Sequence, residues 1–370
     1  MTYRFDAGTM LRPVALAALI LAGLSATAAP VRAVEISPAL KQVIAAADQE
    51  GTIKLSWSAG SLGGAAAAAA IETAMNKAFG SHVKVDYAIG PSMPELGFRM
   101  LQEMKASRPA SADIFIGAAA QIALFAKSDM FEQVDYKSLL PDRITDPMIE
   151  ENGTALAFSS SSAGILYNTK LAPERPTSLA DMLKPEWKGK IATTSYLANF
   201  DFLAATDVWG ADKAIDFAKQ FNGNVAGLVL CPATDNIISG EYLALVMDCG
   251  TQGERFAMEQ GAPIDQVVPK DFAKISYYYY AIPKHAVHKN AAKLFTAFML
   301  TREGQEILWK TWRGDLHLLP GSQEKAWEDD YAKKYGVTFR IYTIDWYEKH
   351  TEMGAALKQM QTILVDSRKN

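Results

Sequence analysis

Small and hydroxyl-bearing residues follow several of the predicted strands, where they could bind a polar solute without reacting with it. Residues 58–64 (Ser-Ala-Gly-Ser-Leu-Gly-Gly) lead directly into a predicted helix, and residues 117–120 (Gly-Ala-Ala-Ala) repeat this arrangement. Glycine lets backbone N–H groups approach a ligand, and the N-terminal end of a helix favours negative charge. These loops predict capture of a small polar organic solute bearing an anionic group such as phosphate, phosphonate or carboxylate. The alternative is that the small residues only make tight turns.

Further polar residues follow the strands in the second half of the chain. Residues 159–162 are four serines, which fit a binding surface and a tight turn equally well. Asp235 and Asp248 could receive a cationic amine, or could cap a helix or face solvent. The predicted ligand-binding residues are Ser58, Gly60, Ser61, Gly63, Ala118, Ala119, Ser161, Ser162, Ser195, Asn199, Asp235, Asp248 and Tyr278.

A run of four tyrosines, residues 277–280, is another candidate for binding chemistry. Alternation along a strand sends Tyr278 and Tyr280 to one face and the other two rings to the opposite face. One face could therefore line a site while the other packs within the sheet. His285 and His288 could indicate a metal, but their surroundings are typical of a solvated approach to a helix. We predict neither a metal nor a cofactor.

The motifs that mark common enzyme classes are missing. The chain contains no G-x-S-x-G, H-E-x-x-H or G-x-G-x-x-G motif, and its five histidines are scattered. The formal net charge of −4 without a basic tract also argues against a nucleic-acid partner. We expect a protein that is not an enzyme. An exported hydrolase-type enzyme assembled from distant residues is the alternative class.

An α/β fold is needed to position these loops. A chain of 370 residues suits two domains, and strands alternate with helices in both halves. A polar connection, residues 135–153, separates the halves. The main predicted strands are 52–57, 83–87, 113–116, 191–193, 225–230, 242–247 and 275–282, and the main predicted helices are 38–50, 65–79, 94–106, 121–127, 200–208, 212–221 and 289–300.

The first 33 residues read as a secretory signal peptide. Arg4 and Arg12 precede an apolar run of eleven residues, 14–24, which is too short to span a bilayer as a mature helix. A small-residue cleavage site follows at residues 31–33. A membrane anchor is the alternative. Neither cysteine lies near the cleavage site, so we do not expect a lipid anchor. The mature protein is therefore expected in the periplasm.

The two cysteines, Cys231 and Cys249, are an even pair in a chain expected to meet an oxidising compartment. The segment between them reads as strand, helix and strand. A right-handed crossover would place those strands side by side and parallel, with both cysteines at their carboxyl ends. We predict a disulfide between them; two buried free thiols are the alternative.

Several blocks of the chain together resemble a known family. Residues 167–191 (YNTKLAPERPTSLADMLKPEWKGKI), residues 113–115 (DIF), residues 239–241 (SGE) and residues 281–305, with AIPKHA and EGQ, occur in the order found in extracellular solute-binding proteins of ABC importers. The resemblance runs from about residue 50 to about residue 310. Some relatives bind ferric iron through a tyrosine pair, but residues 247–250 are Met-Asp-Cys-Gly at that place.

The resemblance implies a two-lobed type II periplasmic-binding fold with hinge strands. Lobe one would comprise residues 34–153 and 281–370, and lobe two residues 154–280. It further implies a monomeric receptor that binds a small molecule between the lobes and delivers it to an ABC permease in the inner membrane. A ferric-iron receptor is the alternative within the family, and a polyamine or thiamine-like cation would require a box of aromatic rings and carboxylates.

Overall fold

Two parallel strands near the start of the chain form a small sheet, β1 (Thr52–Trp57) and β2 (Lys84–Ile89). α1 (Pro38–Glu50) ends at Gly51, whose left-handed backbone lets the chain turn directly into β1. α2 (Gly64–Phe79) connects the strands and buries an apolar face that includes Ile71 and Met75. The helix–strand alternation predicted for this region is confirmed.

The computed structural model describes residues 36–57, 61–248 and 250–368, which belong to one compact unit, Glu35–Asn370. The predicted signal peptide lies outside the described residues, as do Ser58, Gly60 and Cys249. Within the described part of the chain, no helix is both long enough and apolar enough to cross a membrane.

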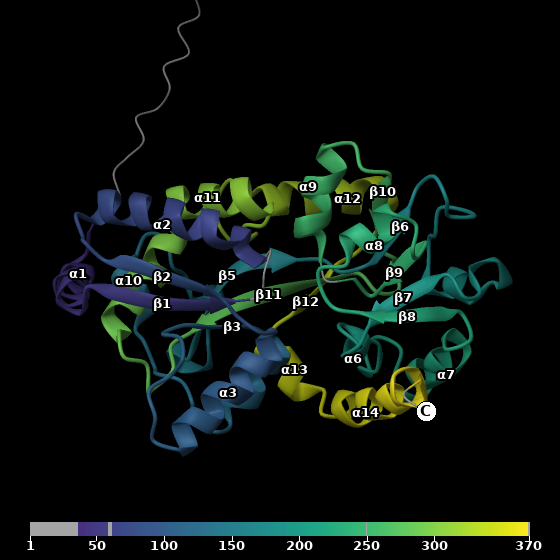
Figure 1. Ribbon diagram of the computed structural model, residues 1–370, viewed down its shortest axis with the longest axis horizontal. Coiled ribbons are helices and arrows are strands. Elements are labelled where there is room, and N and C mark those ends of the chain that lie inside the picture. Colours follow the sequence, from purple (N-terminus) through teal and green to yellow (C-terminus); the bar gives the residue numbers. More distant parts are fainter. Residues whose placement is uncertain (1–35, 58–60, 249, 369–370) are drawn as a thin grey trace, which may run out of the picture. The chain divides into compact units, whose positions relative to one another are not determined.

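A mixed sheet is built around the tyrosine-rich strand β11 (Lys274–Ala281). β11 pairs antiparallel with β5 (Ala155–Ser161), so that Tyr278 lies opposite Ser159. The other strands of this sheet are β3 (Phe115–Ala118), β4 (Ile149–Glu150) and β12 (Arg340–Tyr342). Both β5 and β11 are largely buried, and the two paired strands lie next to each other near the middle of Figure 1.

The second half of the chain forms another five-stranded sheet, in the order β10-β6-β9-β7-β8. Its strands are β6 (Ile165–Asn168), β7 (Ile191–Thr194), β8 (Val225–Val229), β9 (Ala244–Val246) and β10 (Ile264–Val267). The prediction that the strands flanking the cysteine segment are neighbours is wrong, because β7 lies between β8 and β9 and pairs in parallel with both. The rule for crossover connections sets their handedness. It does not require the two connected strands to be neighbours, so a third strand can lie between them.

Two further predictions need correction. The helix predicted at residues 200–208 is a single turn, α6 (Phe200–Leu203). The loop predicted after Gly117 is not a loop, because β3 passes directly into α4 (Ala119–Ala126). Alanine is a good helix former, so the alanine run continues into the helix.

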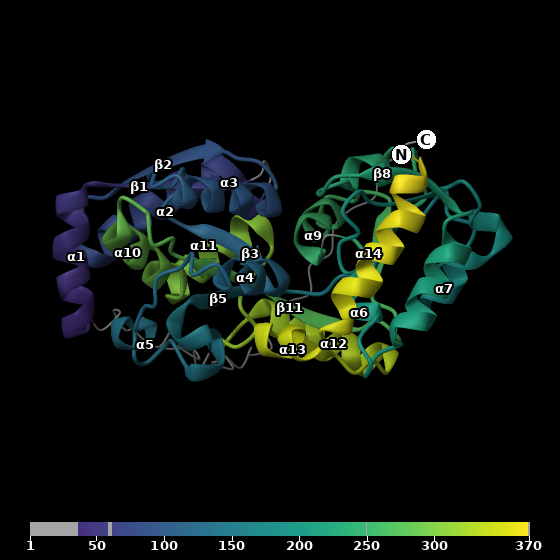
Figure 2. The same cartoon turned by 90° about the horizontal axis from the view of Figure 1, so that it is seen from below.

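The remaining helices cover the sheets and carry the C-terminal part of the chain. α14 packs along α7 and also contacts α6, and α13 contacts α4 (Figure 2). The predicted lobe boundaries stay a prediction. The helices not yet given bounds are α3 (Met93–Lys105), α5 (Tyr136–Leu139), α7 (Ala211–Phe221), α8 (Thr234–Ile238), α9 (Thr251–Glu259), α10 (Lys289–Met299), α11 (Arg302–Trp312), α12 (Gln323–Tyr335), α13 (Ile344–Lys349) and α14 (Glu352–Leu364).

Candidate functional site

The serine tract at the end of β5 is fully buried and contacts the start of α9. Ser161 donates from Oγ to Oε1 of Gln252 at 3.1 Å, and Gln252 donates from Nε2 to the Ser160 carbonyl at 2.9 Å. Ser162 also lies buried, and its hydroxyl has no hydrogen-bond partner among the described residues. Burying a hydroxyl without a partner costs free energy. A ligand that forms a hydrogen bond with Ser162 would recover that cost.

Asp248 follows β9 and is fully buried, but its carboxylate already has three donors. Oδ1 accepts from the backbone N–H groups of Gly164 and Gly250, each at 3.0 Å, and Oδ2 accepts from Nε2 of Gln266 at 2.6 Å. Asn199 donates from Nδ2 to the Asp248 carbonyl at 2.8 Å. The structure therefore brings two predicted residues, Asn199 and Asp248, together and gives the Asp248 carboxylate a role in holding the loop.

Glu254, in the first turn of α9, is a second buried carboxylate with a different environment. Its side chain is 2% exposed, and its own backbone N–H is its one hydrogen-bond donor among the described residues. Burial, followed by repulsion from Asp248, raises the Glu254 pKa to about 8, although Arg255 opposes the change. Burial likewise raises the pKa of Asp248 to about 6. A carboxylate this poorly solvated would be stabilised by a cation.

Aromatic rings lie beside these carboxylates. Burial raises the pKa of Tyr278, and Tyr196, Glu254 and Asp248 raise it further, which places each of these three groups within electrostatic range of Tyr278. The ring of Tyr278 packs against Trp312 with centroids 5.7 Å apart. Tyr196 is partly exposed, and the Cys231 backbone hydrogen-bonds to its hydroxyl. Aromatic rings next to carboxylates are suited to binding a cation.

The backbone around this cluster is unusual. Leu197 (φ 51°), Asn199 (φ 67°) and Met247 (φ 58°) all adopt left-handed conformations, although none is glycine. Such conformations cost about 1–3 kcal/mol each and often occur at ligand sites, where the surrounding structure holds them. Here they flank Asp248 and the segment that presents Tyr196.

The described part of the predicted loop before α2 packs closely against α11. A side chain at Gly63 would lie 2.5 Å from Cβ of Thr311, so glycine lets this turn pack against α11. Ser61 begins that turn and is partly buried. Ala118 ends β3, and its backbone N–H donates to Oε1 of Gln121 at 3.0 Å. Ala119 is buried as the first residue of α4.

Asp235 and Ser195 are placed by other parts of the described structure. Asp235 is exposed in the first turn of α8. Ser195 follows β7, where its backbone carbonyl accepts a hydrogen bond from Nε2 of Gln361 in α14 at 3.2 Å. Their role in binding stays a prediction.

Sequence reasoning missed four residues of this cluster: Tyr196, Gln252, Glu254 and Trp312. Glu254 lies in the segment 250–255 (Gly-Thr-Gln-Gly-Glu-Arg), where an acid at the start of a helix looks like an ordinary first-turn residue. Its burial depends on how α9 packs, which the local sequence does not reveal. Trp312 is far along the chain from Tyr278, and only the fold places the two rings together.

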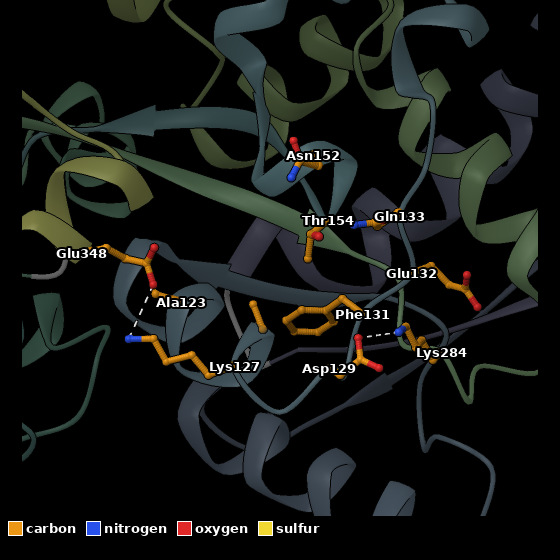
Figure 3. A pocket seen from close by; sticks show the side chains of 11 residues that line it. Ala123, Lys127, Asp129, Phe131, Glu132, Gln133, Asn152, Thr154, Lys284 and Glu348 are labelled. Atoms are coloured by element: carbon orange, nitrogen blue, oxygen red, sulfur yellow. Dashed lines mark hydrogen bonds and ion pairs between the residues drawn. The ribbon is translucent and has the colours of Figure 1, made fainter.

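A separate pocket lies at the other end of α4, with a volume of about 630 Å³. Figure 3 shows Lys127 paired with Glu348 and Lys284 paired with Asp129 at its rim. Phe131 and Thr154 contribute to its wall. Because these charges pair with one another, the pocket shows no preference for a ligand of either sign, and it contains none of the predicted ligand residues.

Comparison with known proteins identifies relatives for most of the chain. Residues 66–336 match the family model described as bacterial extracellular solute-binding protein. The chain is 24% identical over 219 residues to the spermidine/putrescine-binding periplasmic protein of Escherichia coli K12, covering 54% of this chain and 62% of that protein. It is 26% identical over 228 residues to the Fe(3+)-binding periplasmic protein of Serratia marcescens, covering 58% of this chain and 65% of that protein. The matches thus span less than two thirds of either relative.

A solved structure shows the same fold. The periplasmic binding protein AfuA from Actinobacillus pleuropneumoniae, with fructose-6-phosphate bound, superposes with a TM-score of 0.64 at 18% identity. The match covers 84% of this chain and 99% of AfuA. The predicted two-lobed α/β fold of type II periplasmic binding proteins is confirmed.

Proposed function

Because the chain belongs to the bacterial extracellular solute-binding proteins, we propose that it is the substrate-binding receptor of an ABC importer. It captures a small polar solute and delivers that solute unchanged to a membrane permease. Family membership favours binding over catalysis. The periplasmic names of the relatives support a location outside the cytoplasm, in agreement with the signal peptide predicted at residues 1–33.

The ligand class is best supported by the buried carboxylate of Glu254. A protonated amine supplies both the positive charge and the N–H donors that this carboxylate lacks. The rings of Tyr278 and Tyr196 add faces against which a cation is attracted. We therefore propose that the solute carries an amino group, and the similarity to a spermidine/putrescine-binding protein agrees with this choice.

The anionic group that the sequence predicts on the solute stays a prediction. It depends on the loop 58–64, of which residues 58–60 lie outside the described part. The N-terminal end of α2 has no side-chain cap, so its first backbone N–H groups suit an anion. A zwitterionic solute would satisfy both halves of the proposal.

Ferric iron receives less support from the residues present. The described residues contain no group of three or more His, Cys, Asp or Glu side chains placed to hold a metal ion. Asp248 occupies the position where a tyrosine pair would be expected, and three donors already occupy its carboxylate. The similarity to an Fe(3+)-binding protein therefore does not extend to a recognisable donor set.

Closure of the two lobes is the proposed mechanism of capture. Ser161, Glu254 and Tyr278 belong to the predicted second lobe, residues 154–280, whereas Trp312 at the end of α11 belongs to the predicted first lobe. A solute that contacts residues of both lobes favours the closed arrangement by its greater affinity for it. A disulfide between Cys231 and Cys249 would restrain the loop next to Asp248, and mass measurement with and without reductant tests that pairing.

Native mass spectrometry of the exported protein, followed by calorimetry with defined solutes, tests the proposal. A co-purified organic mass, and saturable binding of a diamine such as putrescine, are the expected results. The panel also includes a phosphorylated sugar, a dicarboxylate and ferric citrate. Chemical conversion of a bound solute would contradict the receptor function. Tight binding of a solute without an amine would contradict the proposed ligand class alone.

A further inference from the structure

Arg313 makes an unusually complete set of contacts at the C-terminal end of α11. Its guanidinium donates from Nε and Nη2 to Oε2 of Glu259 in α9, at 2.8 and 2.7 Å. Its Nη1 donates to the carbonyls of Trp309 and Lys310, at 2.9 and 3.0 Å, and so caps the last turn of its own helix. The same group lies 4.9 Å above the ring of Phe256. One side chain thus ties the end of α11 to α9.

These two helices carry different parts of the candidate site. α9 contributes Gln252 and Glu254, and α11 ends at Trp312, which packs against Tyr278. The chain then continues through Gly314, where a side chain would lie 2.9 Å from Cγ of Gln252 and 3.1 Å from Oγ of Ser159. The position of α9 relative to the end of α11 therefore decides how these residues face one another.

The Arg313–Glu259 pair differs from the other surface pair of the same helix. Arg302 and Glu306 are one turn apart in α11 and both largely exposed, so their pairing restrains no other element. Arg313 and Glu259 are 54 positions apart, and the Arg313 side chain is 19% exposed. Because two backbone carbonyls and the ring of Phe256 already hold the guanidinium, little side-chain freedom is lost when it binds the carboxylate.

We propose that Arg313 and Glu259 form a clamp between α11 and α9 that positions Trp312, Gln252 and Glu254 for ligand binding. The proposal rests on the proposed solute-binding function for its consequence, but the clamp itself can be observed without a ligand. In the lobe division predicted from the sequence, α11 belongs to lobe one and α9 to lobe two. Both residues are positioning residues, and neither needs to touch the solute.

The Arg313→Gly variant tests the clamp selectively. Arg313 has a left-handed backbone, φ 61°, which glycine adopts without strain, so the substitution removes the side chain without straining the backbone. It also removes the side-chain cap on the carbonyls of Trp309 and Lys310, which Glu259→Gln leaves in place. Hydrogen exchange of the ligand-free protein should become about two- to five-fold faster in residues 251–259, as expected for loss of one well-placed surface ion pair. Putrescine affinity, measured by calorimetry, should weaken by a similar factor.

Three further measurements separate a clamp from general loosening. Arg302→Ala, which removes the exposed pair within α11, should leave exchange in α9 unchanged. Glu259→Gln should reproduce the effect of Arg313→Gly, and the double variant should be no worse than either single one. Raising the salt concentration should speed α9 exchange in the unaltered protein and not in Arg313→Gly.

Two outcomes would overturn the clamp: unchanged α9 exchange in Arg313→Gly, or additive effects in the double variant. If the unaltered protein binds no putrescine, the exchange data still decide whether the clamp exists, and the failure belongs to the proposed ligand class. If exchange changes while putrescine affinity does not, the clamp holds the helices but does not position the site.

Discussion

Two buried carboxylates, in different parts of the molecule, have opposite surroundings. Asp113, just before β3, is 1% exposed and accepts hydrogen bonds from the backbone of Lys54, Val287 and His288 and from the His288 ring. Glu254 in α9 is 2% exposed and has no donor among the described residues beyond its own backbone N–H. Burial alone therefore does not distinguish a structural acid from a functional one, whereas the number of donors does.

The side chain of Asp113 connects three segments of the chain by hydrogen bonds. Its carboxylate links β1, the start of β3 and the turn before α10, and a charged histidine at position 288 would strengthen the link. Glu254 lacks such donors, and its pKa is raised by burial and by Asp248 and lowered by Arg255, while Glu254 in turn raises the pKa of Tyr278. An arrangement of this kind lowers the stability of the free protein and becomes favourable once a cation enters.

Removing the structural acid should have the largest effect. Asp113→Ala leaves four donors without their acceptor, and we expect it to lower the free energy of unfolding by about 3–5 kcal/mol. Urea unfolding followed by circular dichroism measures the loss. Asp146→Ala, at an exposed ion pair with Lys137, is the matched control and should change stability by less than about 0.5 kcal/mol. Equal losses in the two variants would contradict the contrast.

Glu254, the acid proposed to bind the solute, should behave in the opposite way. Burial raises the pKa of Glu254 to about 8, so the acid is largely neutral in the free protein near pH 7 and ionises when it pairs with an amine. Glu254→Gln should therefore leave stability unchanged or increased and weaken putrescine binding at least about tenfold. Calorimetry and thermal melting report the two quantities on the same sample. Glu241→Gln, another acid of the same predicted lobe, is the control and should leave binding unchanged. A destabilised Glu254→Gln that still binds normally would assign Glu254 to the structural class.

The stability of the protein should also depend on pH through this pair of acids. Because burial raises the pKa of Asp248 from 3.8 to about 6 and that of Glu254 from 4.5 to about 8, the folded state holds these protons more tightly than the unfolded chain. Their stabilising contribution is complete below about pH 4 and is lost as the pH rises through 6 and 8.

Unfolding experiments at several pH values should compare the unaltered protein with Glu254→Gln. The two proteins should be similar at about pH 5, where Glu254 is protonated, and Glu254→Gln should be the more stable one above about pH 8. A difference that stays constant over this range would show that Glu254 does not carry a raised pKa.

The smallest expected effect distinguishes two neighbouring serines. Ser161→Ala loses the hydrogen bond to Gln252 and should cost about 1 kcal/mol of stability. Ser162→Ala removes a buried hydroxyl without a partner and should be neutral or slightly stabilising. Denaturant midpoints measured side by side resolve this difference, and a weaker putrescine affinity in Ser162→Ala would show that the ligand uses the hydroxyl. A larger loss of stability in Ser162→Ala than in Ser161→Ala would show that Ser162, and not Ser161, makes the stabilising hydrogen bond.

Much of the fold could be predicted from local signals, and parts of the candidate site could not. Gly51 and Gly80 end helices as their sequence positions indicate, and the strand 275–282 lies where its tyrosines predict. The insertion of β7 between β8 and β9 was not predictable, because strand order depends on which buried faces pack together. The burial of Glu254 could not be predicted for the same reason, because it depends on neighbours that are distant along the chain.

The amino-acid sequence by itself determined the class of the protein, its α/β alternation and the position of the serine tract in the candidate site, because periodicity, helix ends and small-residue loops are local properties. Only the tertiary structure decided that Asp248 is satisfied by Gly164, Gly250 and Gln266 while Glu254 is not. The physical reason is that solvation and hydrogen-bond supply depend on what packs around a charge, and that environment is assembled from segments far apart in the chain.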